Sequence, residues 1–397
     1  MAGRWEEARA RPWTLVLVVS FALFMDYLIY GAVLPLMAYA PGSAAGEEHL
    51  GLLAAAYAAG VLGATPLFGW MGERKGCRVI LIQGVVLAGV ATLLFAVAPN
   101  FAAVAVARFL QGSAAAATWI AGLAFVAERY SGRRVEMMGY ALMGSTGGAI
   151  LGPLLGGYLY GAGGYALPFV ALLALIAVEA VCCVLLLPRD SGHPGEPHPL
   201  LAILLDWSVA VPAVAVALAA AGWGILEPLL PVHLARLGES GAGDIGVLFA
   251  AATIVYGVAT PGVSWLTERI GVPWTVTIGM IAMALTLPLV SLSHQFGFIL
   301  AGLCLVGISF ALLLNPTSAE LGEAVERRGM VCFPVVYSVY NVAYSVGMLG
   351  TSSFAAAIAA RAGFLNTLLF VSAGLLVCAP AMLLATRPAG TAMAPRR

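Results

Sequence analysis

Twelve long apolar segments, separated by short polar or Pro/Gly-rich breaks, follow one another along the 397 residues of this chain. A helix that spans a bilayer needs about 20 predominantly apolar residues, so almost the whole chain is expected to lie in a membrane. Spanning β-strands would show shorter, alternating segments of about ten residues instead. We therefore predict an all-α membrane protein with twelve transmembrane helices, near residues 13–40, 49–71, 78–98, 101–127, 137–160, 165–187, 205–234, 244–267, 272–294, 296–319, 329–360 and 364–386.

Composition excludes several classes of protein. Only 10% of the residues are charged and the mean hydropathy is +0.97, whereas a soluble domain is about 25% charged. The 19 Lys and Arg residues balance the 19 Asp and Glu residues, so no general attraction to nucleic acid is expected. The six cysteines show no metal-ligand spacing, and no motif of a hydrolase, a nucleotide-binding loop or a dinucleotide fold occurs. We expect no enzyme, no metal site and no cofactor.

Positive charge is distributed unevenly between the two sides of the predicted bundle. Sixteen Lys and Arg residues fall in the two termini and the loops of one side, whereas only Arg236 and Arg361 fall on the other. By the positive-inside rule both termini are cytoplasmic, and the run 13–40 is read as a first span because it is too long for the apolar region of a signal peptide. The other side has short loops without a usable N-glycosylation sequon, which favours a prokaryotic plasma membrane.

The chain contains an internal repeat. Residues 51–76 align without a gap on residues 246–271, at an offset of 195, and 11 of the 26 positions are identical. We predict two six-helix bundles, residues 1–187 and 205–397, joined by a proline-rich cytoplasmic linker at 188–204. Two parallel repeats of this kind enclose a central site at their interface. Two unrelated bundles are the alternative, but they would leave the shared motif unexplained.

The loop after the second span carries a recognisable signature. Residues 69–78 resemble the loop signature of the major facilitator superfamily, with Glu73 in place of the usual Asp and Cys77 in place of a usual Arg. The resemblance covers essentially the whole chain and implies a fold of two six-helix bundles. It also implies a gating role at the cytoplasmic rim for Gly69, Glu73, Arg74, Gly76 and Arg78.

A glycine motif in the fifth span resembles in full the motif typical of proton-coupled exporters of that superfamily. Small residues at this spacing let helices approach closely, and a proline frees a backbone carbonyl and permits a bend. A tightly packed helix is the alternative interpretation. The motif consists of Gly139, Gly148, Gly152, Pro153, Gly156 and Gly157.

The predicted spans contain a few charged residues that need partners. Arg108, in an Arg-x-x-Gln-Gly motif with Gln111, would cost about 2.5–3.5 kcal/mol if it were unpaired in a membrane. Asp26 in the first span is predicted at a similar depth, so we expect an Asp26–Arg108 ion pair. The pair is either purely structural, or Asp26 exchanges among Arg108, a proton and a substrate cation. Asp26, Glu227, Arg108 and Gln111 form the predicted proton-coupling set.

Further polar residues are predicted to line the central site. Glu227 lies in a seventh span weakened by glycine and proline, where buried polar sites are usually built. Burial disfavours the charged form of a carboxyl group, which makes exchange of a proton for a cation chemically available. The eleventh span carries one helical stripe, Tyr337, Tyr340, Asn341 and Tyr344, which either packs or walls a cavity for an organic cation. Asn315, before a proline in the tenth span, is a weaker candidate.

Within the superfamily, the segments 24–35, 226–231 and 336–343 look most like the vesicular monoamine transporter branch of drug:proton antiporters. This resemblance implies that Asp26 and Glu227 recognise an amine between the halves. The branch has a second-span lysine and an eleventh-span aspartate where this chain has Tyr57 and Asn341, so a neutral hydrogen bond is expected to replace that ion pair. The tenth span also lacks the acid of that branch.

The leading hypothesis is a proton-coupled antiporter that exports a cationic, aromatic small molecule by alternating access. Its expected partners are that molecule, protons and lipid, and we expect a monomer. The alternative transporter is a facilitator or exporter of a neutral metabolite with structural acids. A receptor or scaffold on the same fold is a third class, which saturable counterflow in proteoliposomes would eliminate.

Overall fold

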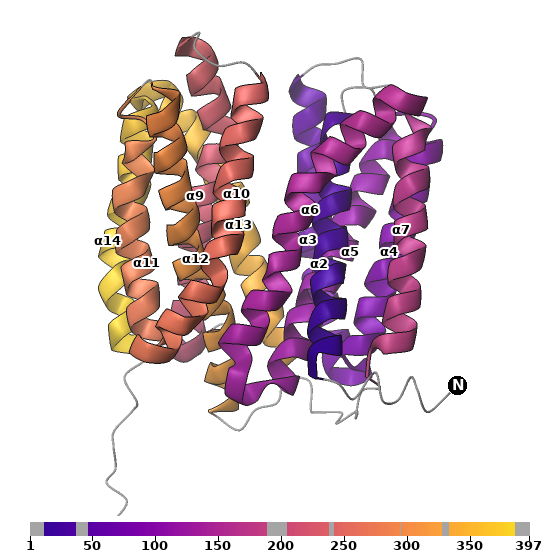
Figure 1. The fold of residues 1–397 in the computed structure, drawn as a ribbon, viewed down its shortest axis with the longest axis horizontal. Coiled ribbons are helices and arrows are strands. Elements are labelled where there is room, and N and C mark those ends of the chain that lie inside the picture. The colour runs from indigo at the N-terminus through magenta and orange to yellow at the C-terminus, as the bar shows by residue number, and fades with distance from the viewer. Residues whose placement is uncertain are drawn as a thin grey trace, which may run out of the picture.

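The structure, a computed structural model, describes residues 12–36, 47–188, 205–237, 242–293, 295–327 and 333–385. Within these ranges the chain forms twelve α-helices and one short 3-10 turn, η2, at Ser131–Arg133 (Figure 1). The helices of the first half are α2 (Pro12–Leu36), α3 (Glu47–Lys75), α4 (Cys77–Val97), α5 (Phe101–Arg129), α6 (Arg134–Gly163) and α7 (Ala166–Leu186). Those of the second half are α9 (Trp207–Leu237), α10 (Ala242–Ile270), α11 (Val272–Leu289), α12 (Phe296–Glu326), α13 (Phe333–Ala362) and α14 (Phe364–Ala385).

This helix order confirms the predicted all-α fold. Nine of the helices in the described ranges are long and apolar enough to cross a membrane by length and composition. The other three helices, α3, α6 and α13, each contact the opposite bundle. Residues 189–204 lie outside the described residues, so the linker and the bundle boundaries remain predictions.

The two halves pack by the same plan. In the first bundle α2 lies against α6, α3 against α5, and α4 against α5 and α7. In the second, α9 lies against α13, α10 against α12, and α11 against α12 and α14, which is the same set of neighbours helix for helix. Figure 1 shows the two bundles side by side.

Local geometry repeats at the offset found in the sequence. Gly76 and Gly271, 195 positions apart, have φ of 84° and 83° between consecutive helices. This region of φ strongly favours glycine, which explains why glycine closes both copies of the motif. Just before each glycine an arginine lies over a tryptophan ring, with centroid distances of 4.4 and 4.1 Å for Arg74–Trp70 and Arg269–Trp265.

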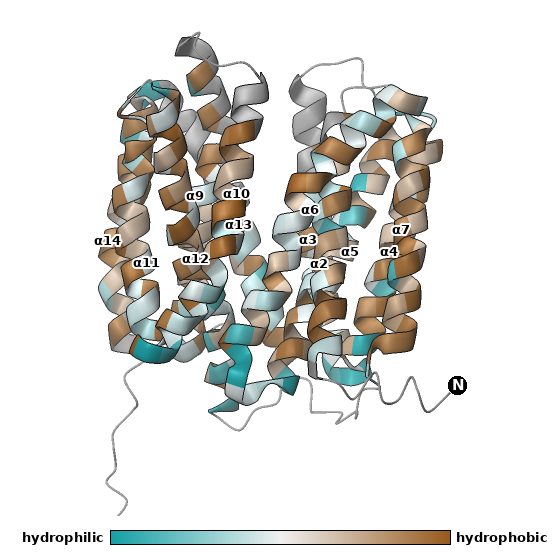
Figure 2. Ribbon diagram, in the orientation of Figure 1, coloured by the Kyte–Doolittle hydropathy of each residue, from teal (hydrophilic) through white to brown (hydrophobic). Residues whose placement is uncertain are grey.

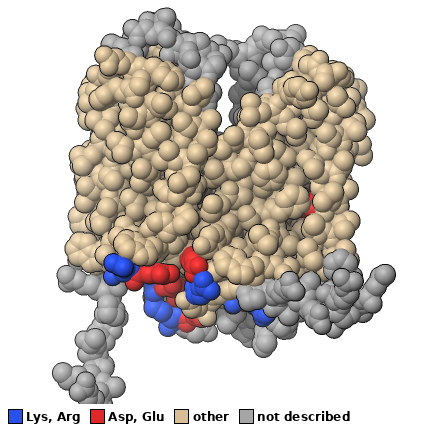
Figure 3. All heavy atoms as spheres, viewed as in Figure 1, with Lys and Arg blue, Asp and Glu red and all other residues tan. Residues whose placement is uncertain are grey.

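Charged and apolar side chains occupy different parts of the surface. The flanks are apolar, with exposed side chains such as Val86, Leu93 and Val97 on α4, as expected where lipid is the solvent. Lys, Arg, Asp and Glu gather at one end, where α3 meets α4, α5 meets α6, α10 meets α11 and α12 approaches α13 (Figures 2 and 3). We call this the charged end, and the other the far end.

The bundles contact each other through α3 with α13, α5 with α13, α6 with α10, and α6 with α12. The specific contacts described below come from the charged end and the middle of these helices. Figure 3 shows the surface hollowed between the bundles at the far end. The helices of the two halves therefore converge toward the charged end.

Candidate functional site

Asp26 lies near the middle of the molecule, on the side of α2 that faces α5. It is 14 residues from Pro12, or about 20 Å along the helix, and its side chain is half-buried. Its carboxylate Oδ2 accepts a hydrogen bond from the indole Nε1 of Trp119 on α5, at 2.9 Å. Sequence reasoning missed Trp119, which directly follows a run of small residues from Ser113 to Thr118.

Aromatic rings form a continuous row around Asp26. Tyr27 lies edge-on to Trp119 with centroids 5.9 Å apart, and Trp119 stacks on Tyr340 of α13 at 6.4 Å and 14°. Neighbouring centroids along the row are 5.0 to 6.5 Å apart. The row, called the aromatic row below, consists of Tyr57, Tyr30, Tyr27, Trp119, Tyr340 and Tyr344. Because Tyr340 and Tyr344 belong to the second bundle, the row crosses the interface beside the carboxylate.

Arg108 has different partners from the one predicted. Its Nη1 donates to Gln111 Oε1 at 2.7 Å, and its guanidinium lies over the rings of Tyr30 and Tyr57, at 5.3 and 5.7 Å. No ion pair with Asp26 occurs among the described residues. In this conformation the expected Asp26–Arg108 pair is therefore not formed, because Asp26 turns toward Trp119 while the arginine is held by an amide and by the faces of two rings.

Asn341 forms a neutral hydrogen bond to α3, but its partner is not the expected Tyr57. Asn341 Nδ2 donates to the hydroxyl of Thr65, 2.9 Å away on α3. Thr65 is two helical turns from Tyr57, toward the charged end. A hydrogen bond does join the two helices, but its donor and acceptor are Asn341 and Thr65, and Tyr57 belongs to the aromatic row.

The eleventh-span stripe is divided between two roles. Tyr340 and Tyr344 belong to the aromatic row. Tyr337 is fully buried and donates to Ser318 O at 2.9 Å, so it packs against α12. The stripe as a whole is thus no cavity wall, since Tyr337 and Asn341 hold helices together.

The polar candidates of the second bundle also differ in role. Asn315 is fully buried, accepts a hydrogen bond from Tyr256 OH at 2.9 Å and donates to Thr260 Oγ1 at 3.0 Å, so it links α12 to α10. Glu227 belongs to α9, but its side chain lies outside the described residues. One turn before it, Trp223 stacks on Phe310 at 5.5 Å.

The glycines of the fifth-span motif pack α6 against α2. A Cβ at Gly148 would come within 2.2 Å of Phe24 O, and one at Gly156 within 2.4 Å of Ala32 O. Gly152 and Pro153 meet α2 in the same row, close to Gly31. Gly139 faces the second bundle instead, close to Thr260 and Ser264 of α10, whereas Gly157 has open space around it. The motif therefore supports the helix that carries Asp26.

The loop motif contributes both packing and charge at the charged end. Cβ atoms at Gly69 and Gly72 would come within 2.2 and 2.5 Å of Ser338 and Pro334 on α13, so glycine allows this contact. Among the charged members, Glu73 is buried, Arg74 is exposed on its own helix, and Arg78 donates to Val184 O of α7 at 2.8 Å.

An ion pair between the bundles comes from outside that motif. Arg134, whose side chain is fully buried, donates from Nη2 to Glu326 of α12 at 2.6 Å and also binds Ala127 O. Because α6 and α12 belong to different halves, this pair joins them at the charged end. In the sequence, Arg134 is only one of the positive residues that indicate the orientation. No local pattern predicts its partner, which lies 192 residues away.

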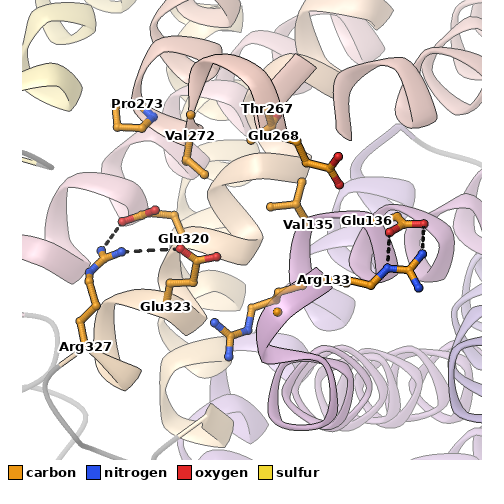
Figure 4. Close-up of a pocket in the computed structure, with 13 residues that line it drawn as sticks. Arg133, Val135, Glu136, Thr267, Glu268, Val272, Pro273, Glu320, Glu323 and Arg327 are labelled. Carbon is orange, nitrogen blue, oxygen red and sulfur yellow. Dashed lines mark hydrogen bonds and ion pairs between the residues drawn. The ribbon is translucent and has the colours of Figure 1, made fainter. Parts of the chain in front are cut away.

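A pocket of about 380 Å³ opens beside this pair (Figure 4). Arg327 pairs with Glu320 and Glu323 on one side, and Arg133 pairs with Glu136 on the other. The hydrogen bonds with Glu136 raise the pKa of Arg133. Since these carboxylates and guanidinium groups largely neutralise one another, we interpret the pocket as part of the closure between the halves.

A sequence model of the family described as Major Facilitator Superfamily matches residues 16–212 and again residues 212–396. The chain belongs to the major facilitator superfamily. The two successive matches agree with the duplication seen in the sequence and in the packing. Membership of this transporter superfamily, and not of an enzyme family, agrees with the expectation that the chain is no enzyme.

Two amine transporters are among the relatives of this superfamily member. The synaptic vesicular amine transporter of Homo sapiens is 27% identical over 320 residues, which cover 80% of this chain and 62% of that protein. The chromaffin granule amine transporter of Rattus norvegicus is 30% identical over 310 residues, which cover 76% of this chain and 59% of that protein. The chain thus spans about three fifths of the length of these relatives, and it resembles the branch expected from its motifs.

A solved structure shows the same fold. The human organic anion transporter MFSD10 superposes with a TM-score of 0.78 over 94% of this chain and 100% of that chain, at 16% identity. At this identity the likeness concerns the fold alone.

Proposed function

We propose that this chain is a secondary active transporter that exports an organic, cationic aromatic amine in exchange for protons. The observation that carries the proposal is the Asp26 carboxylate, which lies between the two bundles within the aromatic row. A carboxylate beside aromatic faces suits an ammonium group attached to a ring, because charge pairing and cation–π attraction act together. The likeness to two vesicular amine transporters supports the same substrate class.

Proton exchange follows from the chemistry of a half-buried carboxyl group. Asp26 can bind either a proton or an ammonium ion, and binding of one releases the other. Glu227 on α9 is proposed as the second exchanging acid. Arg108 and Gln111 are proposed to assist, because Arg108 contacts Tyr30 and Tyr57 of the aromatic row and donates a hydrogen bond to Gln111. A proton taken from outside then expels the amine, and its loss toward the cytoplasm restores the site.

Alternating access requires that the closure at the charged end opens in another state. By the positive-inside rule we assign this end, with both termini, to the cytoplasm, and we place the protein in a prokaryotic plasma membrane as a monomer. The Arg134–Glu326 pair and the α3–α13 contacts then close the cytoplasmic side, while the site is reached from outside.

The test is proton release on ligand binding. Purified protein in weak buffer is mixed with a panel of aromatic amines while the pH is followed. Release that disappears in Asp26→Asn or Glu227→Gln supports exchange of a proton for a cation at that acid. Binding without proton release would contradict coupling and favour the facilitator of a neutral metabolite.

A further inference from the structure

Trp119 is exceptional in its helix. From Gln111 to Ala127 every residue of α5 is buried except Trp119, which is partly exposed. A side chain at this position therefore reaches out of the first bundle and into the space that the aromatic row crosses. Among the described residues it is also the hydrogen-bond partner of Asp26.

The indole is held in place from two sides. Tyr27 meets it edge-on from α2, and Tyr340 stacks on it from the second bundle. Turning the ring away from Asp26 would disrupt both aromatic contacts, each worth about 0.5–1.5 kcal/mol beyond burial. These two contacts therefore stabilise the ring orientation in which Nε1 donates to Oδ2 of Asp26.

This bond makes the two oxygens of the Asp26 carboxylate inequivalent. Oδ2 already accepts a hydrogen bond from the indole N–H at 2.9 Å, so Oδ1 keeps more of its acceptor capacity for a ligand. An ammonium group is a compact charge that one oxygen can bind, whereas a planar guanidinium binds best when it reaches both oxygens in parallel.

We infer that Trp119 is a specificity-determining residue, which makes the Asp26 site select amines over guanidines of the same ring and linker. The inference rests on the proposed function, because it assumes that Asp26 binds the cationic group of the substrate. The indole ring lies beside the carboxylate as part of the aromatic row, and its N–H competes with a second ligand N–H for Oδ2.

The test compares phenethylamine with phenethylguanidine, which share the ring and the two-carbon linker and each carry one positive charge at neutral pH. Affinities are measured by titration calorimetry on the purified chain of 397 residues. We expect the unmodified protein to prefer the amine about tenfold, the effect of one charge-assisted hydrogen bond. Trp119→Phe removes the donor but keeps a ring, and is expected to reduce the preference to about twofold or less.

Controls separate the role of the indole from a general effect of losing a tryptophan. Trp274→Phe changes an exposed tryptophan of α11 and should leave the preference unchanged. Trp119→Leu, which also removes the ring, should weaken both ligands. Equal binding of the two ligands to the unmodified protein overturns the inference without any variant, so the test does not depend on the folding of Trp119→Phe.

The Asp26→Asn variant distinguishes a failure of the proposed function from a failure of the inference about Trp119. If this variant still binds both ligands as the unmodified protein does, or if the unmodified protein binds neither, the proposed function fails and the inference fails with it. If Asp26→Asn abolishes binding but Trp119→Phe keeps the full preference for the amine, only the inference is wrong.

Discussion

Asn341 of α13 donates a hydrogen bond to Thr65 of α3 across the interface between the two bundles, at 2.9 Å. Thr65 is fully buried, and its own hydroxyl donates to Val61 O at 2.6 Å. Ser338, one turn before Asn341, donates to Thr65 O at 3.3 Å. The closed interface is therefore held by buried neutral hydrogen bonds between α3 and α13 and by an ion pair at the charged end.

The Asn341–Thr65 bond should be measurable as a coupling energy. We expect Asn341→Ala and Thr65→Val each to lower the free energy of unfolding. The double variant should lose about 0.5–1.5 kcal/mol less than the sum of the two single losses, because each single variant already removes the same hydrogen bond. Reversible unfolding in detergent measures the cycle. Strictly additive losses would mean that the two side chains do not interact.

Loss of the ion pair at the charged end should favour opening there. Glu326 is 49% exposed, so its pair with Arg134 is partly screened and worth up to about 1 kcal/mol. Glu326→Gln is therefore expected to increase the population of the open state by up to about fivefold. The measurement is the rate at which a water-soluble maleimide modifies a cysteine at Ser338, which is fully buried in the closed interface.

The matched control for this experiment is Glu136→Gln. Glu136 also pairs with an arginine, but Arg133 lies three residues away on the same side of the interface. The control should leave the labelling rate unchanged. Equal acceleration by both variants would attribute the effect to general charge loss.

A disulfide across the interface should arrest transport. A Cβ at Gly139 of α6 would lie 3.1 Å from Ser264 Oγ of α10, a spacing suited to a disulfide. We expect the Gly139→Cys, Ser264→Cys double variant to lose transport on oxidation and regain it on reduction, because the charged end can no longer open. Full transport by the oxidised form in proteoliposomes would contradict closure at this point.

Two glycines of the fifth-span motif should differ in their sensitivity to the same substitution. A Cβ at Gly148 would come within 2.2 Å of Phe24 O, so Gly148→Ala must push α2 aside and is expected to cost about 1–3 kcal/mol and to weaken amine binding at Asp26. Gly157→Ala meets nothing within 4 Å and should stay within about 0.5 kcal/mol of the unmodified protein. Thermal unfolding and ligand titration compare them, and equal losses would show that the contact with α2 is not what the motif provides.

The candidate site could be predicted only in part. Asp26 was identified because a charge in an apolar span is costly, and Tyr340 and Tyr344 because they share one helical face. Trp119 carries no comparable signal, since tryptophan is common in membrane helices and its indole N–H does not specify which residue accepts its hydrogen bond. Its role appears only when α2 brings Asp26 to within 2.9 Å of it.

Local patterns in the sequence determined the twelve helices, the gathering of charge at one end and the duplication, because hydrophobic length, loop charge and a glycine with positive φ depend on neighbours along the chain. The partners of the buried polar groups were decided by the tertiary structure. Asp26 faces Trp119 rather than Arg108, and Asn341 faces Thr65 rather than Tyr57. Each choice depends on the rotation and axial position of one helix against another, and close packing such as that of the α6 glycines against α2 sets both. A shift of two turns along α3 exchanges one hydrogen-bonding partner for another, and no pattern within a single span records that shift.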